Sequence, residues 1–339
     1  MNALDSAAPA RAPWPLRELA SKFAIFLLLV ALIALFEVEE PAFLNINNLF
    51  SILQAVSITA LLGVGITVTL AVGGFDLSAG SLAAFTQMAA SYVLVVLQGS
   101  TAEAVVICLA LGALVGLANA FLIVRVGVPD LLATLGMLFL LVGLELIPTG
   151  GRSISSGTIL PSGYVAHGNF PASFLALGRF QIGGIVPLPV VVLALVALAT
   201  WFVMERTRWG RVFYAIGGNE TAARLAGAPT ARYRVAAYVI SGAIAALGGV
   251  LLAARVGRGD VSAGNSLLLD SVAAALIGYA VLGLNYANVF GTVVGAIFVG
   301  ILLNGLTMLN APYYTQDFVK GAVLVGALAI TFGLRRKAR

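Results

Sequence analysis

Residues 52–72 read ILQAVSITALLGVGITVTLAV, a continuous apolar run without a charged side chain. Roughly 20 helical residues cross a hydrocarbon core about 30 Å thick, so this run has the length of one membrane-spanning helix. Other apolar runs begin with Phe23 to Phe36 and continue at 79–98, 103–124, 131–147, 185–204, 234–254, 268–284, 289–309 and 317–334. Together they predict an all-α membrane protein with about ten transmembrane helices.

The composition also indicates a lipid environment. Of the 339 residues, 60% are hydrophobic and 10% are charged, whereas soluble domains carry about 25% charged residues. A soluble fold would leave these apolar runs facing water. The run at 23–36 lacks a small-residue cleavage site and a second span follows it closely, so we expect a retained helix rather than a signal peptide.

The positions of Lys and Arg orient the expected helices. If the amino terminus is interior, most of the 19 Lys and Arg residues fall in interior segments, as basic residues do in cytoplasmic loops. We therefore predict a multi-pass protein of a bacterial inner membrane with both termini in the cytoplasm. The net charge of +5 then requires no nucleic-acid partner.

The same topology divides the chain. We expect a cytoplasmic N-terminal tail at 1–22, a transmembrane domain at 23–334 and a basic cytoplasmic C-terminal tail at 335–339. Within the transmembrane domain, an exterior loop at 148–184 is rich in Gly, Ser and Pro. An interior loop at 205–233 carries the densest basic cluster of the chain.

Several kinds of chemistry lack their residues. Cys108 and His167 are the single cysteine and the single histidine, so neither a disulfide nor a paired-histidine zinc motif can form within the chain. No GxxxxGK[ST] phosphate-binding loop occurs, so ATP chemistry requires another chain. The GRGD sequence at 257–260 matches the GxGD of some intramembrane aspartyl proteases, but it falls in an expected exterior loop without an evident second carboxylate. We therefore expect neither an enzyme nor a cofactor in this chain.

The GGFDLSAGS sequence at 73–81 separates the second and third expected helices. Its glycines permit unusual backbone conformations, and Asp and Ser can satisfy backbone amides where a helix breaks. Asp76 either caps the third helix or borders a translocation path. Asp270, Asp130 and Glu145 are expected near helix ends, as caps or interfacial groups. Asp76 and Asp270 each begin a similar segment that opens a helix, which hints at an internal repeat of transporter type.

Polar side chains on otherwise apolar helices allow two interpretations. They can line a wet path for a neutral polyhydroxylated solute, or they can bond one helix to another. The path candidates are Asp76, Ser78, Gln54, Gln87, Asn119 and Asn304, and the same polar set includes Thr59, Thr67, Thr69 and Thr307. Small-residue runs such as Gly112 to Gly116 and Gly295 to Gly300 favour close helix packing.

The interior loop contains TRWGRVFYAIGGNETAARLAG at 207–227. Asn219 can cap a short helix of about seven residues that ends at Gly227, with Glu220 and Arg224 spaced i,i+4. A short capped helix parallel to the membrane is suited to coupling with a partner.

These features resemble the permease subunits of the ribose, xylose and arabinose class of ABC sugar importers. The resemblance is carried by 73–81, by 207–227, by LLLDSVAAALIG at 267–278 and by GTVVGAIFVGILLNGL at 291–306. It implies a type II-like importer permease bundle and a second permease chain, expected as a homodimer. It also implies a cytoplasmic ABC ATPase that binds ATP and Mg, and a periplasmic solute-binding protein that delivers a sugar or related polar solute.

By resemblance, the ATPase docks on 217–227. The implied coupling residues are Gly217, Gly218, Asn219, Glu220, Ala223, Arg224, Leu225 and Gly227. The chain departs from many relatives at 279–288, where YAVLGLNYAN replaces a Gly-rich turn. This departure implies a bulkier interior turn and leaves the identity of the solute open.

Two other classes of protein stay open. A secondary transporter would keep coupling carboxylates deep in its helices, and Asp76 is the one fair candidate. A membrane enzyme would need a nucleophile, a base or a metal constellation, for which the sequence offers scattered carboxylates, one His and one Cys.

Overall fold

The computed structural model of the chain describes residues 16–280, 286–312, 314–322 and 325–326. Helices dominate these residues. The long ones are α1 (Leu16–Glu39), α2 (Ile46–Ala71), α3 (Ala79–Ser91), α4 (Thr101–Ala120), α5 (Asp130–Leu146), α7 (Leu188–Arg206), α10 (Thr230–Val256), α11 (Ala263–Ala280) and α12 (Val289–Met308). The shorter elements are η1 (Tyr92–Val96), η2 (Phe121–Val126), η3 (Ile147–Thr149), α6 (Ala172–Arg179), α8 (Arg208–Gly218), α9 (Glu220–Leu225) and a strand pair, β1 (Gln181–Ile182) and β2 (Val186–Pro187).

The expected all-helical membrane fold is confirmed. Within the described ranges, 7 helices are long and apolar enough to cross a membrane: Ile46–Ala71, Ala79–Val96, Thr101–Val126, Asp130–Thr149, Leu188–Arg206, Thr230–Val256 and Val289–Met308. The spans expected at 23–36 and 268–284 correspond to α1 and α11, which are not among these. The count of ten therefore stays a prediction. Much of the last expected span, both outer tails and part of the turn at 279–288 lie outside the described residues.

The first long span begins earlier than the apolar run alone predicts. α2 starts at Ile46 because the Asn45 side chain accepts a hydrogen bond from the Asn47 amide at 3.0 Å, which satisfies a backbone donor of the first turn. The polar residues before 52 therefore belong to the helix. α2 then passes through the core, where it packs against α7, α10, α11 and α12.

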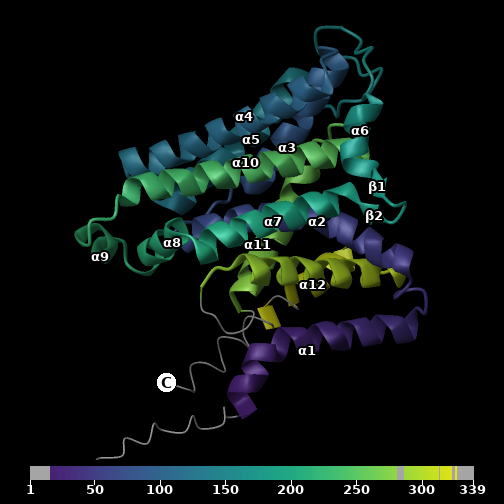
Figure 1. Cartoon of the computed structure of the whole chain (residues 1–339). Coiled ribbons are helices and arrows are strands. Elements are labelled where there is room, and N and C mark those ends of the chain that lie inside the picture. The colour runs from purple at the N-terminus through teal and green to yellow at the C-terminus, as the bar shows by residue number, and fades with distance from the viewer. Residues whose placement is uncertain (1–15, 281–285, 313, 323–324, 327–339) are drawn as a thin grey trace, which may run out of the picture.

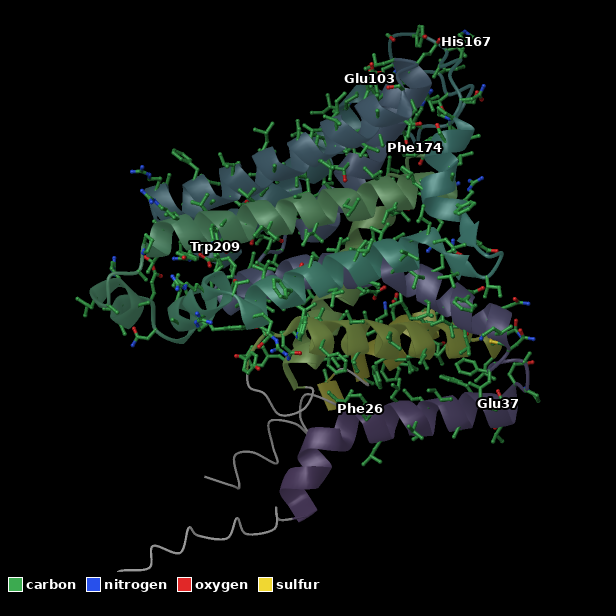
Figure 2. All side chains as sticks on the ribbon, in the orientation of Figure 1. Phe26, Glu37, Glu103, His167, Phe174 and Trp209 are labelled. Atoms are coloured by element: carbon green, nitrogen blue, oxygen red, sulfur yellow. The ribbon has the colours of Figure 1, made fainter. Side chains whose placement is uncertain are left out.

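The bundle is layered (Figure 1). α4 and α5 lie on one side of α10, and α12 and α1 lie on the far side of α7 and α11. α8 and α9 cap one end of the bundle, and α6 with the two strands caps the opposite end. Trp209 of α8 and His167, which precedes α6, mark these two ends in Figure 2. We call them the α9 end and the α6 end.

Small residues permit the closest helix contacts, as predicted. A Cβ atom on Gly112 of α4 or on Gly242 of α10 would overlap the other residue's carbonyl group, and a Cβ on Gly295 of α12 would overlap Ala274 of α11. These positions bring helix backbones together in the manner usual for membrane bundles.

One turn occurs twice in the chain, as GGFDLSAG at 73–80 and GRGDVSAG at 257–264. In the first, Asp76 Oδ1 accepts hydrogen bonds from the Ser78 amide at 2.9 Å and the Ser78 hydroxyl at 2.6 Å. In the second, Asp260 Oδ1 accepts the same two bonds from Ser262 at 3.0 and 2.8 Å. The leading glycines of the two turns have nearly equal positive φ angles, 77° and 75°. The first turn joins α2 to α3 and the second joins α10 to α11, so the chain contains an internal repeat.

This repeat corrects the expected one. Asp270 does not begin a helix, because it lies inside α11, and the residue equivalent to Asp76 is Asp260. The interpretation of Asp76 as the cap of α3 is also wrong. Ser78 occupies the cap position of α3, and Asp76 closes the turn that precedes it.

The two repeats run in opposite directions. The first turn lies at the α9 end, where Gly73 meets Gly217 of α8, and the second lies at the α6 end, where Arg179 donates to Val256 O at 3.0 Å. Their helices also exchange partners, because α4 packs on α10 and α12 packs on α2. This is the arrangement of an inverted-topology repeat, which is common among transporters.

Candidate functional site

The α9 end carries a short helix with a fixed start. The Asn219 side chain accepts a hydrogen bond from the Ala222 amide at 2.9 Å, and Gly227 follows the helix with φ at 87°. The expected cap is confirmed, and the helix has 6 residues, Glu220–Leu225. Ala223 is buried, whereas the Leu225 side chain is 85% exposed. α9 therefore presents an apolar side chain to the outside of the bundle.

A cluster of three charged side chains links α9 to α5 and α10 by ion pairs. Arg234 of α10 binds Asp130 at the start of α5, with its Nη2 atom 2.7 Å from Oδ1 and 3.0 Å from Oδ2. Arg234 Nη1 also donates to Glu220 Oε2 of α9 at 3.1 Å. Glu220 therefore pairs with Arg234, although its sequence spacing suits Arg224. The Arg234 and Asp130 side chains are only 18% and 16% exposed, and Glu220 is 38% exposed.

The Gly-Gly pair at 73–74 meets Gly217 of the pair at 217–218 at this end. A Cβ on Gly73 would lie 3.4 Å from Gly217 Cα, and a Cβ on Gly217 would overlap the carbonyl oxygen of Ala71. A Cβ on Gly74 would lie 2.5 Å from the Tyr238 hydroxyl and 2.7 Å from Asp130 Oδ2. The end of α8, the first turn and the Arg234 cluster are therefore in direct contact.

Asp76, Ser78 and Asn119 form one buried network next to this junction. Asp76 Oδ2 accepts from the Ser241 hydroxyl of α10 at 2.8 Å, and the Ser78 hydroxyl accepts from Asn119 Nδ2 of α4 at 2.9 Å. Asp76 is 2% exposed. The network joins the first turn to α4 and α10, as expected if polar side chains bond helices inside a membrane.

The remaining path candidates also bond one element to another. Gln54 Nε2 of α2 donates to Gly178 O of α6 at 3.0 Å, and Gln87 Nε2 of α3 donates to Arg258 O at 3.1 Å. Asn304 of α12 and Asn48 of α2 exchange two amide hydrogen bonds of 3.1 Å each. Gln54 and Gln87 are thus brought to the α6 end, away from Asp76.

The GxGD segment has no protease geometry. Asp260 pairs with Arg258, with 2.7 Å between Nη2 and Oδ2, and no second carboxylate contacts it among the described residues. The hydrogen bonds from Ser262, together with Arg258, hold the pKa of the Asp260 carboxyl below its ordinary value. A catalytic pair of carboxylates that shares one proton requires the opposite arrangement.

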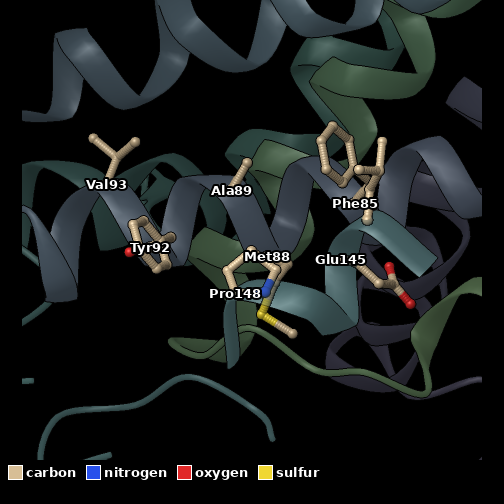
Figure 3. Close-up of a pocket in the computed structure, with 8 residues that line it drawn as sticks. Phe85, Met88, Ala89, Tyr92, Val93, Glu145 and Pro148 are labelled. Atoms are coloured by element: carbon tan, nitrogen blue, oxygen red, sulfur yellow. The ribbon is translucent and has the colours of Figure 1, made fainter. Parts of the chain in front are cut away.

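One cavity of about 310 Å³ lies between α3, η1, α5 and η3 (Figure 3). Its wall is largely apolar, with Phe85, Met88, Tyr92 and Pro148 among the lining residues. Glu145 lies beside the end of α5, as expected, but its side chain is buried at 3% exposure. Its Oε2 atom has no hydrogen-bond partner within the described part of the chain. Such an isolated carboxyl group inside a membrane protein is costly.

A second cavity, of about 300 Å³, lies between α2, α11 and α12. Asn304 lines it together with Thr59, Thr307 and Asp270. Asp270 Oδ1 binds Lys320 Nζ at 2.7 Å, and each of the two side chains is 14% exposed. The sequence did not reveal this pair, because Lys320 falls in an apolar run that starts far from Asp270 along the chain. The helical segment at 314–322 brings Lys320 to α11.

An apolar bundle of two inverted repeats, with a capped surface helix fastened to its long helices, is the architecture of a membrane permease. The chain belongs to the family described as the branched-chain amino acid transport system permease component, whose family model matches residues 48–328. It is 35% identical to the ribose import permease protein RbsC of Escherichia coli K12 over 304 residues, which cover 89% of this chain and 91% of that protein. It is 29% identical to the galactose/methyl galactoside import permease protein MglC of Salmonella typhimurium, with 90% and 92% covered.

A solved structure supports the fold. A metal-chelate type ABC transporter in an inward-facing conformation matches with a TM-score of 0.50 and 17% identity, and the match covers 92% of this chain and 99% of that chain. The family model and the similarity to RbsC and MglC confirm the resemblance to sugar importer permeases. The chain is a multi-pass membrane protein of the ABC permease class, whose members work with ATPase and binding-protein partners.

Proposed function

We propose that this chain is the transmembrane permease subunit of an ATP-driven importer and forms the translocation path for a sugar or related polar solute. The observation that carries this proposal is its similarity to sugar import permeases over nearly all of both chains. Neutral polar side chains within the apolar bundle are compatible with a solute that carries hydroxyl groups and no charge.

The ATPase docks on α9 in this proposal. The docking segment comprises Gly217, Gly218, Asn219, Glu220, Ala223, Arg224, Leu225 and Gly227, and its ATPase partner binds ATP and Mg. The exposed Leu225 supports this role because an exposed apolar tip fits a pocket on a partner. The Arg234 cluster supports it because a force on α9 would act directly on α5 and α10.

The α9 end then faces the cytoplasm, and both termini lie on that side of the bacterial inner membrane. The α6 end, within the segment at 148–184, receives the periplasmic binding protein. A second permease chain completes the path, and we expect a homodimer. The candidates for the translocation path stay Asp76, Ser78, Gln54, Gln87, Asn119 and Asn304, of which Asn304 lines the cavity between α2, α11 and α12.

Purification of the complete importer in mild detergent tests the docking assignment. The tagged chain should retain an ATPase that carries a phosphate-binding loop, as identified by mass spectrometry. Arg224→Glu should reduce ATPase recovery and the uptake of D-ribose, D-xylose or D-galactose into proteoliposomes. Arg152→Glu, an exposed charge reversal at the α6 end, is the matched control and should leave ATPase recovery unchanged.

Two results would contradict the proposal. A chain that never retains an ATPase, even after gentle crosslinking, and that transports solute in response to an ion gradient alone would be a secondary transporter. Equal ATPase recovery by the Arg224→Glu and Arg152→Glu variants would remove the docking site from α9.

A further inference from the structure

The cavity between α2, α11 and α12 has both apolar and polar lining residues. Val56, Ala296 and Gly300 are among the apolar ones, and a Cβ on Gly300 would overlap Val56, so α2 and α12 nearly touch there. Its volume of about 300 Å³ lies at the lower end of the range of roughly 300–1,000 Å³ for small-molecule sites. This size suits one small solute rather than an oligomer.

A charged pair lies at the wall of this cavity. Asp270 and Lys320 lie among apolar helix residues, and ionisable groups at such depth face a protein interior or a water-filled space. The Lys320 ammonium group donates a hydrogen bond to Asp270 Oδ1 at 2.7 Å. Asp270 Oδ2 accepts no hydrogen bond from the described residues, and Asp270 is part of the cavity wall. Within the described part of the chain, this carboxylate oxygen is therefore available to a ligand.

Two further polar side chains, Asn304 and Thr59, line this cavity. Asn304 is held by its double bond to Asn48. The Thr59 hydroxyl donates to no atom within the described ranges, whereas the Thr67 hydroxyl, two turns further along α2, donates to Gly63 O at 2.8 Å. The Thr59 hydroxyl is thus not engaged in a hydrogen bond to a backbone carbonyl of its own helix.

We propose that this cavity is a binding site for a neutral, polyhydroxylated solute of monosaccharide size, with Asp270 as the hydroxyl acceptor. Thr59 exchanges hydrogen bonds with the same solute, the Thr307 hydroxyl, which donates to Leu303 O at 2.8 Å, accepts one, and the apolar lining residues contact its C–H face. Lys320 neutralises Asp270, so the site as a whole carries no net charge and does not attract cations. This inference rests on the proposed import function and identifies where the transported solute binds.

Accessibility of an introduced thiol tests the site. Cys108 is buried and is the one cysteine of the sequence, so Cys108→Ala with Thr59→Cys provides a single reactive position inside the cavity. In the complete importer in proteoliposomes, a charged water-soluble methanethiosulfonate should label this cysteine. The transported sugar among D-ribose, D-xylose and D-galactose should slow labelling at least about fivefold at saturation. Cys108→Ala with Ser162→Cys, an exposed position at the α6 end, should show no effect of sugar.

Uptake by charge variants gives a second readout. Asp270→Asn should lower uptake at subsaturating sugar about tenfold, since a hydrogen bond to a charged group contributes about that factor. Asp317→Asn is the matched control, because Asp317 also contacts Lys320, at 3.3 Å, but is exposed. If Asp270→Asn fails to assemble, Asp270→Asn with Lys320→Gln removes both buried charges and should restore assembly without restoring uptake.

The outcomes separate this inference from the function on which it rests. Uptake of none of the three sugars by the unmodified importer would overturn the proposed function and the assigned ligand together. Normal uptake with sugar-independent labelling, and equal uptake by Asp270→Asn and Asp317→Asn, would overturn the site alone. Complete protection of Thr59→Cys without sugar, relieved by delipidation, would show that lipid fills the cavity and would also overturn the site.

Discussion

Substitution of Asp130 or Arg234 by alanine tests directly how much their ion pair, which holds α9 against α5 and α10, contributes to stability. Breaking a fully buried pair costs about 3–5 kcal/mol, because the remaining charge stays desolvated. The side chains of Arg234 and Asp130 are 18% and 16% exposed, which reduces the expected cost to about 2–3 kcal/mol. The bond to Glu220, whose side chain is 38% exposed, adds about 0–1 kcal/mol. Arg234→Ala should therefore lower the free energy of unfolding by about 3 kcal/mol, and Asp130→Ala by about 2–3 kcal/mol.

A double-mutant cycle measures the interaction itself. We expect a coupling energy of about 2 kcal/mol between the two positions, because the double variant buries neither unpaired charge. The assay is an SDS titration of the purified chain in mixed micelles, followed by circular dichroism of the helices. Arg232→Ala removes an exposed arginine from the same helix and should change the stability by less than about 0.5 kcal/mol. Additive effects of Arg234→Ala and Asp130→Ala, within about 0.5 kcal/mol, would refute the assignment of a buried pair.

Three further substitutions probe the junction and the repeat. Gly217→Ala places a Cβ on the carbonyl of Ala71 and should abolish ATP-driven uptake in proteoliposomes, whereas Gly136→Ala in α5, whose Cβ would meet nothing within 4 Å, should retain it. Gly80→Ala places a Cβ 2.5 Å from Leu268 Cβ of α11 and should cost about 1–3 kcal/mol in the SDS titration; Gly143→Ala, which faces open space, should be neutral. Asp76→Ala leaves the hydroxyl groups of Ser78 and Ser241 without their buried acceptor and should abolish uptake while the chain still reaches the membrane. Its repeat counterpart, Asp260→Ala, should reduce uptake less, because Asp260 is less buried than Asp76 and pairs with the exposed Arg258.

The sequence predicts the fold wherever the information is local. The length of the apolar run at 52–72 fixes a spanning helix by geometry alone. Asn219 and Gly227 fix the start and end of α9 through backbone hydrogen bonds and a positive φ angle. These features need no knowledge of the rest of the chain.

The contacts of the candidate site depend on tertiary packing and could not be predicted in this way. Arg234 meets Asp130 from a position 104 residues away, and Lys320 meets Asp270 across 50 residues. The spacing of Glu220 and Arg224 suggests a local ion pair. Glu220 instead bonds to Arg234, whose side chain is more buried than that of Glu220. Local propensity thus identifies α9 but not the residues to which it is fastened.

The repeat was visible in the sequence but was matched in the wrong register. Alanine-rich helix segments after Asp76 and Asp270 are alike because small residues suit any close helix contact. The informative residues are those of the turn, Gly-x-x-Asp-x-Ser-Ala-Gly, since each has a specific conformational or hydrogen-bonding duty. The residues at 257–260 match a protease motif in sequence, but in the structure they form the same turn as 73–76.

The inverted repeat explains why the two ends of the bundle can respond to different partners. The first turn touches Gly217 at the α9 end, and the second touches the segment at 148–184, where Ile154 and Gly259 exchange backbone hydrogen bonds of 2.9 Å. The helices that leave these turns, α3 and α11, meet where a Cβ on Gly80 would lie 2.8 Å from Gly264 O, at equivalent residues of the two repeats. Because this contact is so close, a tilt of α3 is expected to move α11. A displacement applied at α9 is therefore expected to reach the turn at the α6 end through a single helix crossing, which couples one end of the bundle to the other.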